Sequence, residues 1–127
     1  MSYKAPPPDG FENLPILNRA TEGYKMWHEF LQHFPRLSRY SLGARIDTLF
    51  AEVLELIFLA KYSNKNDKLL FINKATIKLD LLKFFLQIAW TIKALDNGKY
   101  ARLSKPLNEI GKMLGGWRKL FQKETPR

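Results

Sequence analysis

Residues 72–89 read INKATIKLDLLKFFLQIA, and the apolar residues of this stretch recur at alternating steps of three and four. This spacing places side chains on one stripe of an α-helix, which must be buried against another element. Three further segments show the same spacing. The four stripes are Leu17, Ala20, Tyr24, Trp27, Leu31 and Phe34; Leu42, Ile46, Leu49, Val53, Leu56 and Ala60; Ile72, Ala75, Leu79, Leu82, Leu86 and Ala89; and Leu103, Leu107, Ile110, Leu114, Trp117 and Phe121. They predict an all-α protein, an antiparallel up-and-down four-helix bundle.

Length and composition favour one domain, because 127 residues with 46% apolar content suffice for a single core. We expect a flexible proline-rich arm over residues 1–12, the bundle over residues 13–122 and a short tail over residues 123–127. The chain contains no cysteine, which fits a reducing compartment and a cytoplasmic location. The longest uncharged apolar stretch, residues 84–92, is about half of the roughly 20 residues that a membrane span needs. A soluble protein without membrane contact is expected.

Helix-breaking residues separate the first two segments. Pro35 cannot continue a helix and disfavours helical geometry at Phe34, so we predict that the first helix ends there. Ser38 or Ser41 would then cap the second helix, which continues to about Tyr62.

The remaining two helices are separated by an Asn-Gly pair at residues 97–98. The third helix would follow the polar residues 63–66 and run to about Asp96, where this pair supplies the left-handed stop. The fourth helix would begin directly afterwards, with Pro106 either kinking it or lying in a first turn that Ser104 caps.

The third helix carries a second apolar face opposite its stripe, and one bundle core cannot bury both. This face consists of Ile77, Leu81, Phe84 and Ile88, with Leu95 further along. This face could widen the contact of the third helix with the core. The second helix has a milder second face that could do the same, formed by Phe50, Leu54, Ile57 and Phe58. We favour a subunit interface formed by Ile77, Leu81, Phe84 and Ile88, because an exposed strip of this kind promotes aggregation. The protein is therefore expected to be a homo-oligomer.

Charge is concentrated in the second half of the chain. Residues 1–60 hold 6 Lys and Arg against 7 Asp and Glu, whereas residues 61–127 hold 15 against 5. On the fourth helix, five basic residues recur at steps of 3, 7, 7 and 4 and form one stripe. They are Arg102, Lys105, Lys112, Lys119 and Lys123. The third helix adds Lys74, Lys78 and Lys83 to the candidate basic surface.

These basic residues allow two interpretations. A lysine-rich face can simply be solvated, but a net charge of +9 and a pI of about 9.9 are typical of a protein that binds a polyanion. Nucleic acid is the favoured polyanion, since the stripe lacks the long apolar flank of a membrane-bound helix. We expect little sequence preference, because Tyr62, Trp90 and Tyr100, the candidates for base stacking, are more often packing or helix-end residues than stacking platforms.

The sequence shows no arrangement typical of catalysis or metal binding. His28 and His33 lie five residues apart and so point in different directions on a helix, which is unsuitable for a shared metal and favours surface positions. The carboxylates are scattered, without the Glu-x-x-His pairing of di-iron bundles. We therefore expect a protein that is not an enzyme and that needs neither metal nor cofactor.

Residues 107–117, LNEIGKMLGGW, resemble the C-terminal signature of a small four-helix-bundle family. This family includes the accessory variability determinant proteins of diversity-generating retroelements and the proteins encoded in intervening sequences of bacterial 23S ribosomal RNA genes. Three further pieces match in order, namely LPI at 14–16, FP at 34–35 and SLGARI at 41–46. The resemblance therefore spans the bundle from about residue 14 to residue 121.

The resemblance implies a five-fold, barrel-like homo-oligomer with a positive surface. Such an accessory protein associates with the retroelement's reverse transcriptase and with nucleic acid, and it supports mutagenic copying of template RNA into cDNA without being an enzyme. The alternative is an interaction bundle of the ribosomal intervening-sequence type, whose role is undefined.

Two features of the matching pieces carry specific expectations. Arg45 lies at the start of the second helix, where the helix dipole disfavours a cation, so it should pair with a carboxylate or an incoming phosphate. Gly111, Gly115 and Gly116 each cost roughly 1 kcal/mol against Ala in a helix interior. They should therefore let a neighbouring helix approach closely.

Overall fold

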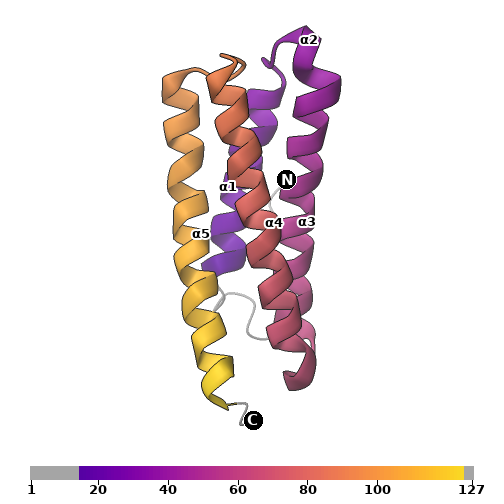
Figure 1. Ribbon diagram of the computed structural model, residues 1–127, viewed down its shortest axis with the longest axis vertical. Coiled ribbons are helices and arrows are strands. Elements are labelled where there is room, and N and C mark those ends of the chain that lie inside the picture. Colours follow the sequence, from indigo (N-terminus) through magenta and orange to yellow (C-terminus); the bar gives the residue numbers. More distant parts are fainter. Residues whose placement is uncertain (1–14, 125–127) are drawn as a thin grey trace, which may run out of the picture.

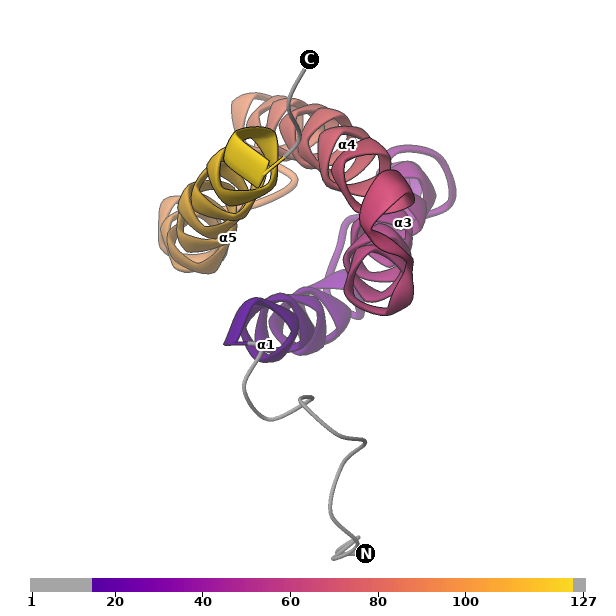
Figure 2. The same ribbon diagram turned by 90° about the horizontal axis from the view of Figure 1, so that it is seen from below.

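The computed structural model describes residues 15–124, with side chains as far as residue 122. Its elements are α1 (Pro15–Leu31), α2 (Arg36–Ser38), the π-helical turn η1 (Arg39–Gly43), α3 (Ala44–Tyr62), α4 (Lys65–Thr91) and α5 (Asn97–Glu124). The four long helices run alternately up and down (Figure 1). Seen from below in Figure 2, consecutive long helices are neighbours, and α5 also contacts α1. The predicted all-α, antiparallel four-helix bundle is confirmed, and the residues described contain no strand. The expected arm over residues 1–12 lies outside the described residues, as do residues 125–127 of the expected tail.

The core is built from the predicted stripes. Every residue of the stripe on α4 is buried, as are Leu103, Leu107, Ile110 and Leu114 on α5. Phe50 and Ile57 are buried as well, which confirms that α3 widens the core contact, whereas Phe58 remains 48% exposed. Among the described side chains, no polar or charged residue is buried. The interior therefore supplies hydrophobic stabilisation, and all the polar chemistry lies at the surface.

Helix α1 ends at Leu31, three residues before the predicted end at Phe34. The chain tightens there, because the N–H of His33 donates to the Phe30 carbonyl at 3.0 Å and that of Phe34 to the Leu31 carbonyl at 3.1 Å. Bonds of this i to i−3 type are common in a last helical turn. Pro35 then precedes the short helix α2.

The prediction that Ser38 or Ser41 caps α3 is wrong. Helix α3 follows η1 without a side-chain cap at Gly43, and the Ser41 hydroxyl donates to the Ser38 carbonyl at 3.4 Å. The N–H of Ala44 donates to the Ser41 carbonyl within the preceding turn. Because the helical path is nearly continuous from α2 to α3, the first N–H groups of α3 find carbonyl partners and need no cap.

The turn between α4 and α5 also differs from the prediction, which extended the third helix to Asp96. Helix α4 ends at Thr91, and Lys93 adopts the left-handed conformation with φ of 67°. This geometry carries Leu95 into the core, where it is 2% exposed, and its N–H donates to the Ala89 carbonyl at 3.2 Å. Leu95 therefore does not belong to the second face of α4. Burial of Leu95 and the backbone bonds to Ala89 outweigh the strain at a non-glycine residue.

Helix α5 begins directly after Asp96, whose carboxylate caps it by accepting the N–H of Lys99 at 2.8 Å. The Asn-Gly pair of residues 97–98 therefore opens this helix and does not close the previous one. Pro106 is the tenth residue of α5, so the first-turn alternative is wrong, and the helix continues past it. Ser104 is not a cap, because its hydroxyl donates to a carbonyl one turn earlier, at 2.9 Å.

Polar contacts tie the helices together at both ends. Between α1 and α3, the Tyr24 hydroxyl and the Trp27 indole N–H both donate to one oxygen of Asp47, at 2.9 and 3.1 Å. Between α3 and α4, the Lys68 ammonium donates to the carbonyls of Ala60, Lys61 and Ser63 at 2.9, 3.0 and 2.9 Å. Lys68 therefore supplies a charged donor to carbonyls at the end of α3, of which that of Ala60 also accepts from the Ser63 hydroxyl at 3.2 Å.

Helix α1 is much shorter than α5, with 17 residues against 28. Arg19 Nε lies 3.0 Å from a Glu109 carboxylate oxygen, so these two residues lie at the same height along the bundle axis. At 1.5 Å per residue, α5 extends about 16 Å beyond Pro15. The difference is visible in Figure 1, where the lower end of α1 lies above that of α5.

Replacing Lys68 by Met should lower the free energy of unfolding by about 1 to 3 kcal/mol, because three carbonyls lose a charged donor. The measurement is urea denaturation followed by circular dichroism. The matched control is Lys74→Met on the exposed side of the same helix, which should change the unfolding free energy by less than about 0.5 kcal/mol. Equal effects of the two substitutions would contradict the capping role of Lys68.

Tyr24 should make stability depend on alkaline pH. Burial raises the pKa of Tyr24 above its ordinary value of 10.0, and the hydrogen bond to Asp47 and its negative charge act in the same direction. Because the folded state holds the proton more tightly, this stabilisation is present below about pH 10 and is lost as the pH rises through the folded-state pKa.

Tyr24→Phe should therefore lose less unfolding free energy than the wild type between about pH 9 and pH 11. Urea titrations of both proteins at several pH values measure this difference in unfolding free energy. The other tyrosines contribute equally to both proteins and so do not affect it. Parallel losses in the two proteins would show that Tyr24 does not contribute.

Candidate nucleic-acid interface

The predicted basic stripe of α5 faces outward, on the side of the helix away from its buried residues. Lys105, Lys112 and Lys119 are all exposed, and they are separated by two helical turns each. Among the described side chains, none of the three forms an ion pair. We call these three residues the α5 lysine row. Lys123 lies in the last turn of α5, beyond the side chains that the structure describes.

Arg102 lies on the edge of α5 that faces α1. Its guanidinium carbon is 5.1 Å from the centre of the Phe30 ring, and the Lys99 ammonium is 5.6 Å from the same centre. Both cations can therefore be held by the π face of Phe30. Lys99 was absent from the sequence candidates, although its step of three from Arg102 could have indicated it.

A hollow of about 490 Å³ lies between α1 and α5 and is lined by Arg19, Arg102, Lys105 and Glu109 among others. Arg19 lies 3.0 Å from the carboxylate oxygens of both Glu22 and Glu109, so its charge is compensated. Arg102 and Lys105 have no such partner among the described residues. Arg102 therefore adds positive charge beside Lys105, at the upper end of the α5 lysine row.

The three basic candidates on α4 do not form one surface. The Lys78 ammonium pairs with Glu52 of α3 at 3.2 Å, and the exposed Lys74 shares a hollow of about 430 Å³ with Glu52 and Glu55. Lys83 is half-buried on the opposite edge, where its ammonium faces α5 at Gly111. The structure therefore brings together the candidates on α5, while acidic neighbours reduce the positive charge around Lys74 and Lys78.

Arg45 is exposed and lies 5.7 Å above the Phe85 ring of α4. Within the described residues it has no carboxylate partner, so of the two expected partners only the incoming phosphate stays a prediction. The aromatic ring takes that place, because α3 and α4 pack closely at this level.

The second apolar face of α4 points to solvent in the single chain. Ile77 and Phe84 are 60% and 54% exposed, and Leu81 and Ile88 between and beyond them are half-buried. Leu81 also packs against the core and so widens it in part, whereas Ile77 and Phe84 remain largely exposed. The subunit interface expected from the sequence stays a prediction.

The two histidines, His28 and His33, are both exposed, as expected. Between residues 15 and 122, no three His, Asp or Glu side chains come close enough to hold a metal ion. Across the same residues, no helix has the length and apolar character that crossing a membrane requires.

Residues 16–121 match the family model described as bAvd-like. The chain belongs to the bAvd-like family. The resemblance inferred from residues 107–117 is thereby confirmed. A search of curated proteins gives no match.

The glycines of the signature in this bAvd-like chain serve different purposes. A Cβ on Gly111 would lie 3.6 Å from a Leu79 methyl group and 3.4 Å from the Lys83 ammonium, so Gly111 lies at the contact between α5 and α4. Gly115 and Gly116 have no neighbour within 4 Å of such a Cβ. A side-chain Cβ would therefore fit at all three positions, so the expected close approach of a neighbouring helix is not found within the described chain.

Proposed function

We propose that this bAvd-like protein is a non-catalytic, nucleic-acid-binding accessory subunit of a diversity-generating retroelement. In this role it partners the reverse transcriptase while template RNA is copied, with mutations, into cDNA. Membership of the bAvd-like family supports the assignment over an interaction bundle of the ribosomal intervening-sequence type. Family membership is also the support for the reverse transcriptase as partner.

The observation that carries the nucleic-acid role is the α5 lysine row. Lys105, Lys112 and Lys119 recur every seven residues along a straight surface, which corresponds to about 10.5 Å between neighbours at 1.5 Å per residue. Exposed ammonium groups that form no ion pair with a described residue suit contacts with a phosphate backbone, and such contacts provide no sequence readout.

The exposed apolar face of α4 supports assembly into a homo-oligomer, which we propose to be a pentamer. Ile77, Leu81, Phe84 and Ile88 lie on α4, while the α5 lysine row lies on the next helix. Contacts between copies through α4 would therefore leave every row free. Several rows in one assembly would give a broad positive surface.

The genomic neighbourhood of the gene separates the two alternatives. A neighbouring reverse transcriptase gene with a template repeat and a variable repeat is expected. A reading frame that lies inside a 23S ribosomal RNA gene would contradict the retroelement assignment and favour the intervening-sequence type.

Replacing both Lys112 and Lys119 by Glu should weaken binding to single-stranded RNA. The slope of log K against log salt should become shallower by about 1.4, because each lost phosphate contact on a single strand removes about 0.7. The measurement is a fluorescence anisotropy titration at several salt concentrations.

The charge-matched control is Lys25→Glu with Arg36→Glu, two exposed residues outside α5. It changes the net charge by the same amount and should leave most of the slope intact. Equal losses in both variants would mean that net charge alone matters, and no binding by the wild type at low salt would overturn the nucleic-acid role.

Phe84→Asp should convert the oligomer into a monomer while the helical content stays constant, since it places a charge in the proposed contact. Multi-angle light scattering of the wild type should give about five times the chain mass of 14.9 kDa. The control is Phe58→Asp, which changes a similarly exposed ring on α3. A monomeric wild type at micromolar concentration would overturn the proposed assembly.

A further inference from the structure

We propose that Trp90 stacks on one unpaired nucleobase of a single-stranded nucleic acid, in the hollow at the turn between α4 and α5. The inference rests on the proposed nucleic-acid role and adds to it a contact with a base. In this proposal the α5 lysine row binds the phosphates of the strand. Stacking on Trp90 requires that the base at this point is not paired with another base.

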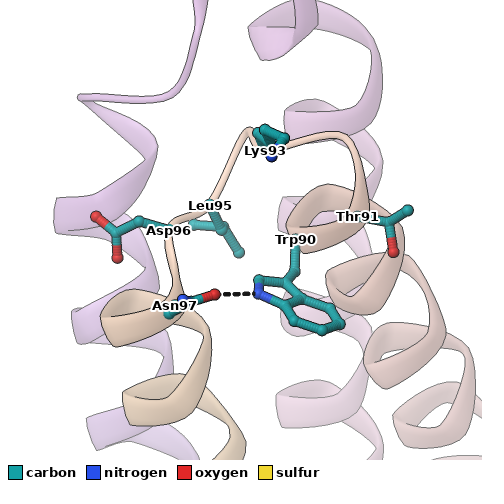
Figure 3. Close-up of a pocket in the computed structure, with 6 residues that line it drawn as sticks. All are labelled: Trp90, Thr91, Lys93, Leu95, Asp96 and Asn97. Carbon is teal, nitrogen blue, oxygen red and sulfur yellow. Dashed lines mark hydrogen bonds between the residues drawn. The ribbon is translucent and has the colours of Figure 1, made fainter.

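The hollow has a volume of about 520 Å³, and Figure 3 shows the residues around it. They are Trp90, Thr91, Lys93, Leu95, Asp96 and Asn97. Tyr100 stacks on the Trp90 ring with 5.0 Å between ring centres and 9° between ring planes. Tyr100 thus covers one face of the ring, while Trp90 as a whole is 40% exposed and lines the hollow.

The Trp90 ring is held in place before any ligand binds. Its indole N–H donates to the side-chain oxygen of Asn97 at 2.7 Å, as the dashed line in Figure 3 marks. This bond and the Tyr100 stack both come from α5 and fix the ring across the turn. A base that stacks on it would therefore immobilise little additional side-chain freedom, which favours affinity. A tryptophan that served packing alone could be enclosed, as Trp27 is at 0% exposure.

The charges around the hollow suit a phosphate at its rim. The Asp96 carboxylate caps α5 by accepting the N–H of Lys99 at 2.8 Å, and in Figure 3 it points away from the Trp90 ring. Lys93 lines the hollow, is exposed and has no ion-pair partner among the described residues. Its ammonium group can therefore contact the phosphate that belongs to the stacked nucleotide.

The hollow is connected with the basic surface along the contact between α4 and α5. Tyr100, which stacks on Trp90, also lines a second, smaller hollow of about 130 Å³ together with Lys83, Ser104 and Asn108. These residues provide a cation and two hydrogen-bonding side chains below the aromatic pair. A strand that leaves Trp90 can follow this line towards Lys112 on the same helix.

The test uses single-stranded RNA that carries the fluorescent base 2-aminopurine, whose emission is quenched on stacking. Trp90→Leu should weaken binding roughly 5- to 150-fold, the range expected for one stacked base, and should abolish the quenching. The salt slope should stay unchanged, because the lost contact is uncharged. The control is Trp117→Leu, which removes a half-buried tryptophan of α5 outside the turn and should change affinity less than two-fold.

Unchanged affinity and quenching in a folded Trp90→Leu protein would overturn the inference. If the double variant Lys112→Glu with Lys119→Glu loses affinity in the same experiment, the proposed nucleic-acid role would still stand. A wild type that binds no nucleic acid would overturn both. If Trp90→Leu does not fold, the wild type is photo-crosslinked to RNA that contains 5-iodouracil. Crosslinks at Trp90 would support the stacking site, and crosslinks only at other residues would overturn it.

Discussion

The packing of four apolar stripes against one another determines what the rest of this chain can do. Large side chains such as Trp27 and Phe50 fill the interior, and between residues 15 and 122 no polar or charged side chain is buried. A polar group in such an interior would lose its water without gaining partners. Charged and hydrogen-bonding groups are therefore confined to the outer faces of the helices, where they are available for recognition of other molecules.

The outer faces divide this task between two helices. On α4 the exposed residues include the apolar Ile77 and Phe84, whereas on α5 they include the positively charged lysine row. Trp90 and Tyr100 stack across the contact between these two helices. The proposed apolar contact, phosphate contact and base stacking thus involve different residues, so that each can be altered without removing the others.

Periodicity predicted the helices and the core well, because burial of a stripe is a property that each helix carries in its own sequence. The boundaries were harder. The Asn-Gly pair of residues 97–98 is typical of a helix end, yet Leu95 enters the core and Lys93 takes the left-handed conformation in its place. The spacing of the lysines on α5 likewise predicted that they form one row, and the row faces outward. Partners from other helices, such as Glu52 for Lys78, depend on tertiary packing, which no local pattern encodes.

The different lengths of α1 and α5 give the two ends of the molecule different surroundings. At one end, Trp90 is fixed to Asn97 and Tyr100 across the turn. At the other, the final turns of α5 extend beyond the described part of α1 and pack on the core through Leu114, Trp117 and Phe121. Lys105 therefore shares a hollow with Arg19 and Met26 of α1, whereas the hollow beside Lys119 is lined by residues of α5 alone.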